Sequence, residues 1–89
     1  MSTNNSKYYV YAIKSLSRNN IYVGLTNNLE RRIYDHNKGY NRTTKPYSPF
    51  LTIYTQDFNS RIEARLREKY LKSGVGKDFL RKLERSLID

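Results

Sequence analysis

The stretch from Tyr22 to Ile33 constrains the fold of this chain more than any other. Residues 21–23 are a β-branched and aromatic run typical of a strand, Gly24 ends that run, and a helical pattern begins at Asn28. A strand that passes into a helix in this way places free backbone N–H groups and the positive end of the helix dipole beside the strand tip. Such a junction is a good place for a phosphate group, although many junctions of this kind bind nothing.

The charge balance favours a polyanionic partner. The 89 residues are enough for one domain with a small core, and 17 Lys and Arg against 8 Asp and Glu give a net charge of +9. The nine tyrosines offer rings on which nucleic-acid bases can stack. We therefore expect a nucleic acid as partner, the alternative being that the excess of cations serves only solubility.

The scarcity of cysteine and histidine restricts the possible chemistry. The chain has no Cys and one His, which excludes disulfides, thiol catalysis, thiolate zinc sites and multi-histidine metal sites. Any metal must be a hard ion held by carboxylate and water. No segment is long and apolar enough to cross a bilayer, and the first seven residues lack the apolar core of a signal peptide. We expect a cytoplasmic protein with a disordered tail at residues 1–6.

Three strands and a first helix are expected in the first two thirds of the chain. Residues 7–13 form a strand with Tyr9, Tyr11 and Ile13 on one face, and a polar connection leads to a second strand at residues 21–23. The resulting hairpin brings Tyr11 close to Tyr22. The other expected elements are a helix at residues 28–38, stopped by Gly39, and a third strand at residues 50–55.

Residues 40–49 are basic, aromatic and contain proline, a composition that predicts neither strand nor helix. This loop is either a mobile connector or an arm that touches nucleic acid through Arg42 and Lys45.

Two helices are expected after the third strand. Ser60 and Glu63 form a capping box that starts a helix over residues 61–73. This helix has two apolar sides, which predicts that it is sandwiched between neighbours. The run Ser73-Gly74-Val75-Gly76 is expected to break it, before a last helix at residues 77–87. In the helix over residues 61–73, one apolar side consists of Ile62, Leu66 and Tyr70, and the other consists of Ala64 and Leu71.

Glu68 borders the second packed side of that helix, so its carboxylate needs a partner. Lys72 at i+4 and a divalent cation are the two candidates, and the spacing alone favours Lys72.

Taken together, these residues resemble the GIY-YIG nuclease domain over residues 7–85. The likeness is closest to the short stand-alone members, which are similar to the nuclease domain at the front of the bacterial excision-repair incision subunit. The matching residues are Tyr9-Val10-Tyr11, Tyr22-Val23-Gly24, Thr26, Asn28-Leu29, Arg31-Arg32, His36-Asn37, Glu63-Ala64, Arg67-Glu68 and Leu71-Lys72. The chain departs from the pattern at Tyr9, where the name-giving residue is glycine, and at Leu25, where some relatives carry lysine.

The resemblance implies an α+β domain over residues 7–87, with a three-stranded antiparallel sheet flanked by helices. It implies an endonuclease that hydrolyses DNA phosphodiester bonds with one Mg²⁺ or Mn²⁺ ion, structure-selective and linked to repair or recombination, with a protein partner as a further possibility. The alternative is a catalytically silent module that binds DNA or RNA.

The resemblance also implies roles for individual residues. Glu68 would be the sole protein ligand of the metal ion, and Arg32 would hold the scissile phosphate. Tyr11 would activate the attacking water with support from Tyr22, or His36 would be the general base, and the sequence leaves both open. Nucleic-acid contacts are expected from Arg31, Arg42, Lys45 and Lys72.

Overall fold

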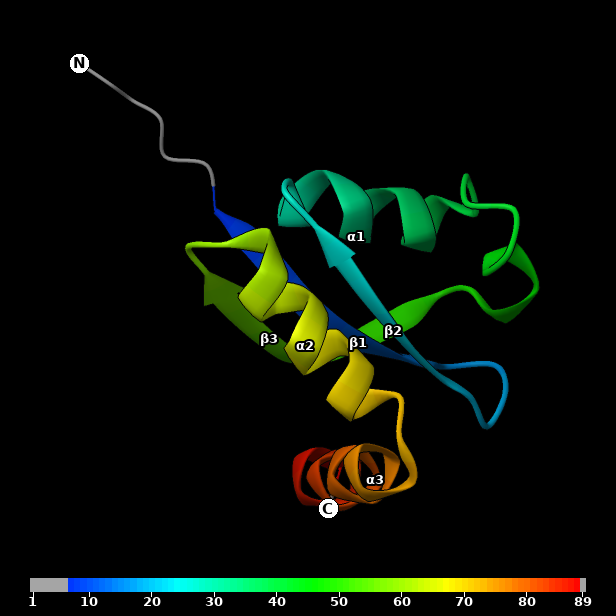
Figure 1. Cartoon of the computed structure of the whole chain (residues 1–89). Helices are drawn as coiled ribbons and strands as arrows, with labels where there is room; N and C mark the ends of the chain where they lie inside the picture. Colours follow the sequence, from blue (N-terminus) through cyan, green and yellow to red (C-terminus); the bar gives the residue numbers. More distant parts are fainter. Residues whose placement is uncertain (1–6, 89) are drawn as a thin grey trace.

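The computed structural model describes residues 7–88 (Figure 1). The tail expected at residues 1–6 lies outside the described residues. No helix of the part described is long and apolar enough to cross a membrane. The elements follow in the order β1 (Tyr8–Ser15), β2 (Ile21–Thr26), α1 (Leu29–Lys38), a 3₁₀ helix η1 (Lys45–Tyr47), β3 (Phe50–Phe58), α2 (Arg61–Leu71) and α3 (Gly74–Ile88).

The strands form one antiparallel sheet in the order β2-β1-β3, which confirms the predicted α+β class. β1 is the central strand, with Tyr11 opposite Gly24 of β2 and opposite Thr55 of β3. Its register against β3 shifts between Ala12 and Ile13.

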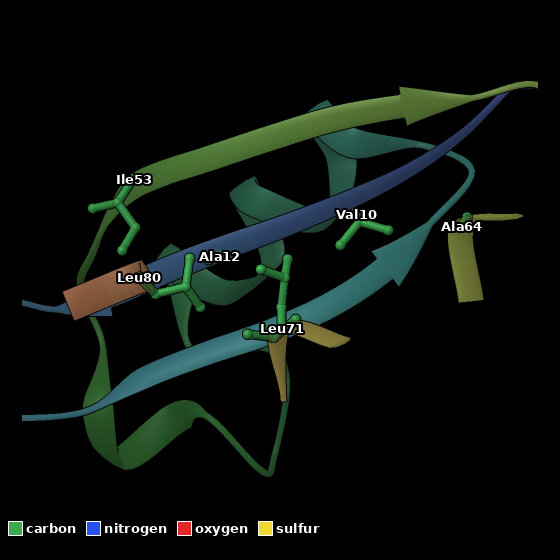
Figure 2. Packing of buried hydrophobic residues seen from close by; sticks show 7 residues of the cluster. Val10, Ala12, Ile53, Ala64, Leu71 and Leu80 are labelled. Carbon is green, nitrogen blue, oxygen red and sulfur yellow. The ribbon is translucent and has the colours of Figure 1, made fainter. Parts of the chain in front are cut away.

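Each face of the sheet has its own core. Tyr11 and Ile13 point to one face, where Phe50 and the half-buried Leu29 and Ile33 complete a cluster against α1. The opposite face carries the larger cluster, which packs against α2 and α3 (Figure 2). Its buried members are Val10, Ala12, Val23, Ile53, Ala64, Leu71 and Leu80.

Helix α1 follows the sequence prediction closely. The Asn28 side chain accepts a hydrogen bond from the Arg31 backbone N–H and caps the first turn. Gly39 ends the helix with φ of 75°, a left-handed conformation that glycine adopts without steric cost.

The boundary between α2 and α3 was predicted wrongly. α2 ends at Leu71, and Gly74 already belongs to α3, which Ser73 caps by accepting a hydrogen bond of 3.3 Å from the Gly76 N–H. Gly76 is buried, and a Cβ there would clash with the backbone of Tyr70 and Leu71. The glycine therefore permits a close approach of two helices, which cross so that Figure 1 views α3 almost along its axis and α2 from the side.

The predicted sandwiching of α2 is also wrong. Ala64 and Leu71 are buried against the sheet, but Ile62 is 75% exposed, Leu66 64% and Tyr70 39%. Only one of the two apolar sides is covered within residues 7–88, because no element of that part packs over the outer side of α2.

The loop at residues 40–49 contains the short helix η1, contrary to the prediction. Pro46 lies in its first turn, where a fixed φ and a missing N–H are tolerated. The loop is fastened to the domain by Thr44, which is buried, and by a hydrogen bond of 2.6 Å from the Ser15 hydroxyl to the Tyr47 carbonyl.

Candidate active site

Tyr11 lies at the centre of the candidate site, on the central strand of the sheet. Its side chain is completely buried, in the cluster that faces α1. Gly24, opposite it on β2, is required for this placement, because a Cβ there would clash with the Tyr11 hydroxyl group and ring. The prediction that the strand ends at Gly24 is wrong, because β2 continues to Thr26; the glycine lies inside the strand and makes room for the phenol.

His36 connects Tyr11 to the loop at residues 40–49. Its Nε2 shares a hydrogen bond of 2.8 Å with the Tyr11 hydroxyl, and its Nδ1 shares one of 2.7 Å with the Thr44 hydroxyl. All three side chains are buried. The imidazole is therefore held at both nitrogens, in a chain of hydrogen bonds that runs from β1 through α1 to the loop.

Tyr22 is the third ring of this group. Its centroid lies 6.3 Å from that of Tyr11 and 5.1 Å from that of His36. The sequence prediction that the two tyrosines meet across the hairpin is confirmed. Tyr22 is half-buried, whereas Tyr11 and His36 are shielded from solvent, so it forms the outer part of the group.

The environment keeps both Tyr11 and His36 neutral at pH 7. Burial raises the pKa of Tyr11 well above its ordinary value, the neighbouring Tyr22 and Glu68 raise it further, and Arg32 opposes them through its charge and hydrogen bonding. Burial lowers the pKa of His36, the positive charge of Arg32 lowers it further, and Asp35 opposes them. The phenol is thus a weak acid and the imidazole a neutral acceptor or donor.

Glu68 approaches the same group from α2. The residue is buried to 8% exposure, and its carboxylate receives a hydrogen bond of 3.1 Å from Lys72 and lies 3.8 Å from Arg65. The partner that the spacing favoured, Lys72, is confirmed. The Glu68 carboxylate contributes to the raised pKa of Tyr11, although α2 and the Tyr11 side chain lie on different sides of the sheet.

Comparison with known proteins supports one family. The family model described as the GIY-YIG catalytic domain matches residues 7–88. The UPF0213 protein SH2523 of Staphylococcus haemolyticus is 36% identical over 80 residues, which cover 89% of this chain and 96% of that protein. The UPF0213 protein YazA of Bacillus subtilis is 37% identical over 73 residues, covering 81% and 71%. The chain belongs to the GIY-YIG family.

A solved structure agrees with this assignment. The NMR structure of the UPF0213 protein BH0048 from Bacillus halodurans superposes with a TM-score of 0.53 at 31% identity, covering 86% of this chain and 84% of that one. The GIY-YIG domain is a nuclease domain, so the family points to a nucleic-acid substrate, and GIY-YIG nucleases generally depend on a divalent metal ion.

The donor groups at the site suit a hard ion bound mainly by water. Within residues 7–88 no three His, Asp or Glu side chains gather, so a cage made of protein ligands is excluded there. Glu68 supplies one carboxylate at the edge of a buried polar group, and the cations that now neutralise it come from flexible exposed side chains. A Mg²⁺ ion, which keeps most of its waters, fits one such carboxylate.

Of the residues predicted to contact nucleic acid, only some lie at the candidate site. Lys72 is at the site through its ion pair with Glu68. Arg31 points outward from α1 and pairs with Asp35 at 3.5 Å. Arg42 and Lys45 are exposed on the loop. Their role in binding nucleic acid remains a prediction.

Thr44 is the residue that sequence reasoning missed. It stands eight positions after His36 in a loop, outside any helical or strand periodicity, and nothing in its neighbourhood predicts that it is buried. Asn41, whose side chain accepts hydrogen bonds from the Thr43 and Thr44 N–H groups, is a signal for a turn, as Asn commonly is, but not for the burial of Thr44.

Proposed function

We propose that this protein is a metal-dependent endonuclease that hydrolyses phosphodiester bonds in DNA. The observation that carries the proposal is the buried hydrogen bond between Tyr11 and His36, in the electrostatic field of both Arg32 and Glu68. A buried tyrosine or histidine alone is usually structural. A joined pair that also feels a guanidinium and a carboxylate is typical of a site for acid–base chemistry on an anionic substrate.

We propose a direction for these hydrogen bonds. Burial keeps the Tyr11 phenol protonated at neutral pH, so its hydroxyl donates to Nε2 of His36, 2.8 Å away. Nε2 then accepts, and the proton of the neutral imidazole resides on Nδ1 and is donated to the Thr44 hydroxyl. We assign the Nδ1–H tautomer to His36 on this basis.

This tautomer is the basis for assigning tasks to the two candidate bases. Tyr11 keeps its proton at neutral pH and both side chains are buried, so the proposed mechanism requires that substrate binding brings a water molecule to the Tyr11 oxygen. We propose that they act in series. An attacking water gives a proton to the Tyr11 oxygen as Tyr11 gives its own proton to Nε2 of His36. The hydroxide attacks phosphorus, the bond to the leaving oxygen breaks, and that oxygen takes a proton from solvent.

Arg32 and Glu68 have complementary tasks in this proposal. The guanidinium of Arg32 matches two phosphate oxygens and stabilises the charge that increases on them. Glu68 would hold the divalent ion, with Lys72 moving from the carboxylate to a phosphate oxygen. A divalent ion bound there supplies stabilisation of the negative charge on the leaving oxygen.

We further propose that the enzyme selects DNA by structure, with a role in repair or recombination. Support comes from the side chains of the site. They are cations and a metal-binding carboxylate, which interact with the phosphate backbone of a nucleic acid rather than with base edges.

The test of the function is a matched pair of variants on α2. Glu68→Gln removes the carboxylate without changing its shape, and Glu63→Gln makes the same change at an exposed residue on the same helix. We expect Glu68→Gln to lower cleavage by at least about a hundredfold while Glu63→Gln cleaves normally. Supercoiled, branched and single-stranded DNA and RNA are assayed with Mg²⁺, Mn²⁺ or a chelator.

The alternative is a silent nucleic-acid-binding module, and the ion pair between Glu68 and Lys72 is the observation that favours it. A module would bind with strong salt dependence, and Mg²⁺ would change neither the affinity nor the length of the nucleic acid. Full cleavage by Glu68→Gln would refute the role of Glu68, and no metal-dependent cleavage of any substrate by the wild type would favour the module.

A further inference from the structure

A pocket of about 280 Å³ lies beside the candidate site, on the sheet face opposite α1. It is bounded by the edge strand β2, the end of α2 and the start of α3; Figure 1 shows the short connection that leads from α2 into α3. Its apolar lining consists of Ile21, Val23, Leu71 and Leu80, of which the last three are buried in the core and Ile21 is half-buried. The bottom of the pocket is therefore rigid and apolar.

Three cations line the same pocket: Lys72 from α2, and Lys77 and Arg81 from α3. Lys77 and Arg81 are four residues apart, so they share one face of the helix. Within residues 7–88 neither has a carboxylate partner; Arg81 contacts only the Asn19 side-chain oxygen, at 3.5 Å. This combination of an apolar bottom and unpaired cations suits a ligand with a flat apolar part and negative charges.

A neighbouring cation on α3 is neutralised locally. Lys82, on another face of α3, pairs with Asp78 at 3.3 Å. A second pocket, at the start of α1, has Glu30 and no Lys or Arg in its lining.

The pocket adjoins Glu68 of the candidate site through Lys72. Lys72 belongs to both, because it lines the pocket and bonds the Glu68 carboxylate at 3.1 Å. Tyr22 also contributes to the pocket lining, but its ring lies tilted beside that of His36, on the face toward α1. A substrate strand that places a phosphate at Glu68 would bring a neighbouring nucleotide to Lys72 at this opening.

We propose that the pocket binds one unpaired nucleotide next to the scissile phosphate, its base on the apolar bottom and its phosphates on Lys72, Lys77 and Arg81. This inference rests on the proposed function. A base in a duplex is stacked and paired, and extruding it costs a few kcal/mol, so the pocket selects single strands, flaps and branch points. The subsite supplies a physical cause for the structure selectivity proposed above.

The first test measures binding without cleavage. A fluorescein-labelled single-stranded oligodeoxynucleotide is titrated with wild type, Lys77→Ala, Arg81→Ala and Lys82→Ala in the presence of a chelator. The first two variants should each lose about fivefold in affinity at 0.1 M salt and lower the slope of log Kd against log salt by about 0.7. Lys82→Ala removes the same charge from another face of the same helix and should bind like the wild type.

The second test fills the pocket without changing charge. Ile21→Phe should lower the affinity for the single strand by about fivefold or more, leave duplex binding and the salt slope unchanged, and so reduce the preference for unpaired DNA. Thermal unfolding of each variant identifies a folding defect. If Ile21→Phe does not fold, the comparison of Lys77 and Arg81 with Lys82 decides alone.

The outcomes separate this inference from the proposed function. Equal losses for Lys82→Ala and the two pocket variants, or none for any, would overturn the subsite even if the enzyme cleaves DNA. If the protein cleaves no substrate but the Lys77 and Arg81 variants still bind more weakly than the Lys82 variant, the nucleotide pocket is supported and the proposed endonuclease activity is refuted.

Discussion

At the scale of single residues, the site depends on two groups whose pKa values are displaced in opposite directions by the same burial. The Tyr11 pKa is raised and the His36 pKa is lowered, so both are neutral over a wide range around pH 7. A hydrogen bond of 2.8 Å joins them, so a proton can move between them without either meeting solvent.

The pH dependence of cleavage follows from the His36 pKa. His36 must be neutral to accept a proton, and its pKa lies below its ordinary 6.5, so kcat/KM should hold at neutral pH and fall with a midpoint below pH 6.5. A pH–rate profile checks this, and a midpoint above 6.5 would contradict the assignment.

Stability must be measured alongside that profile. In the unfolded chain His36 is protonated near pH 6.5, whereas in the folded state its pKa is lower and the imidazole stays neutral. The unfolded state therefore binds more protons, and the folded state loses stability as pH falls from 6.5 toward the lowered pKa.

Thr44 is expected to fix the tautomer of His36. Thr44→Val removes the acceptor for Nδ1–H, so the Nδ1–H tautomer should become less populated and cleavage should fall about tenfold. The chain has a single histidine, so its imidazole ¹⁵N shifts report the tautomer without ambiguity. Thr44→Ser should retain the wild-type tautomer population and cleavage rate, and Thr43→Val, at the exposed neighbouring residue, should change neither. An unchanged tautomer in Thr44→Val would refute the role.

The sequence predicted most of this site, but through the joint pattern rather than single residues. Tyr11 and Tyr22 follow from strand alternation, and His36 from its place one turn after Arg32. Thr44 could not be predicted, because its burial depends on how the loop folds back under α1, a tertiary event with no local periodicity.

At the scale of elements, the junction of α2 and α3 shows how one residue type can be misread. The predicted break between the last two helices is present, but it lies at residues 72–73, and Gly74 and Gly76, which suggested it, belong to α3. Glycine signals either a flexible backbone or a close contact, and the sequence does not distinguish the two. The existence of the three strands was predicted from their β-branched and aromatic runs. Their ends were not, because β2 continues past Gly24 to Thr26 and β3 extends to Phe58, where pairing with β1 decides the length.

The two glycines of α3 should respond oppositely to alanine. At Gly76 the new Cβ meets the backbone of Tyr70 and Leu71, which cannot move aside, so Gly76→Ala should destabilise the fold by about 3 kcal/mol. At Gly74 a Cβ meets nothing within 4 Å, and alanine favours the helix, so Gly74→Ala should be neutral or stabilising by up to about 1 kcal/mol. Urea denaturation of both variants measures the difference, and equal effects would contradict the close-contact explanation.

At the scale of the whole molecule, the domain has two cores on one sheet and a bare outer side on α2. Amphipathic periodicity identifies which residues of a helix are apolar, but it does not say whether a second neighbour exists to cover them. The prediction that α2 is sandwiched failed for this reason.

Substitutions on the two sides of α2 should therefore differ in cost. Leu71→Ala leaves a cavity between α2 and the sheet and should cost about 2–5 kcal/mol, whereas Leu66→Gln on the exposed side should change stability by about 0.5 kcal/mol or less. Chemical denaturation checks both values, and a large loss for Leu66→Gln would indicate that the outer side is covered in solution.

The burial of β1 has a consequence for how such a domain can change over time. Residues Val10, Tyr11, Ala12 and Ile13 are all completely buried, two facing each core, and one of them is the proposed reacting phenol. In both natural and laboratory evolution, almost no position in this segment tolerates substitution. New specificities would have to arise at the periphery, in the loop after α1 and on the exposed faces of α2 and α3, while the central strand stays nearly fixed.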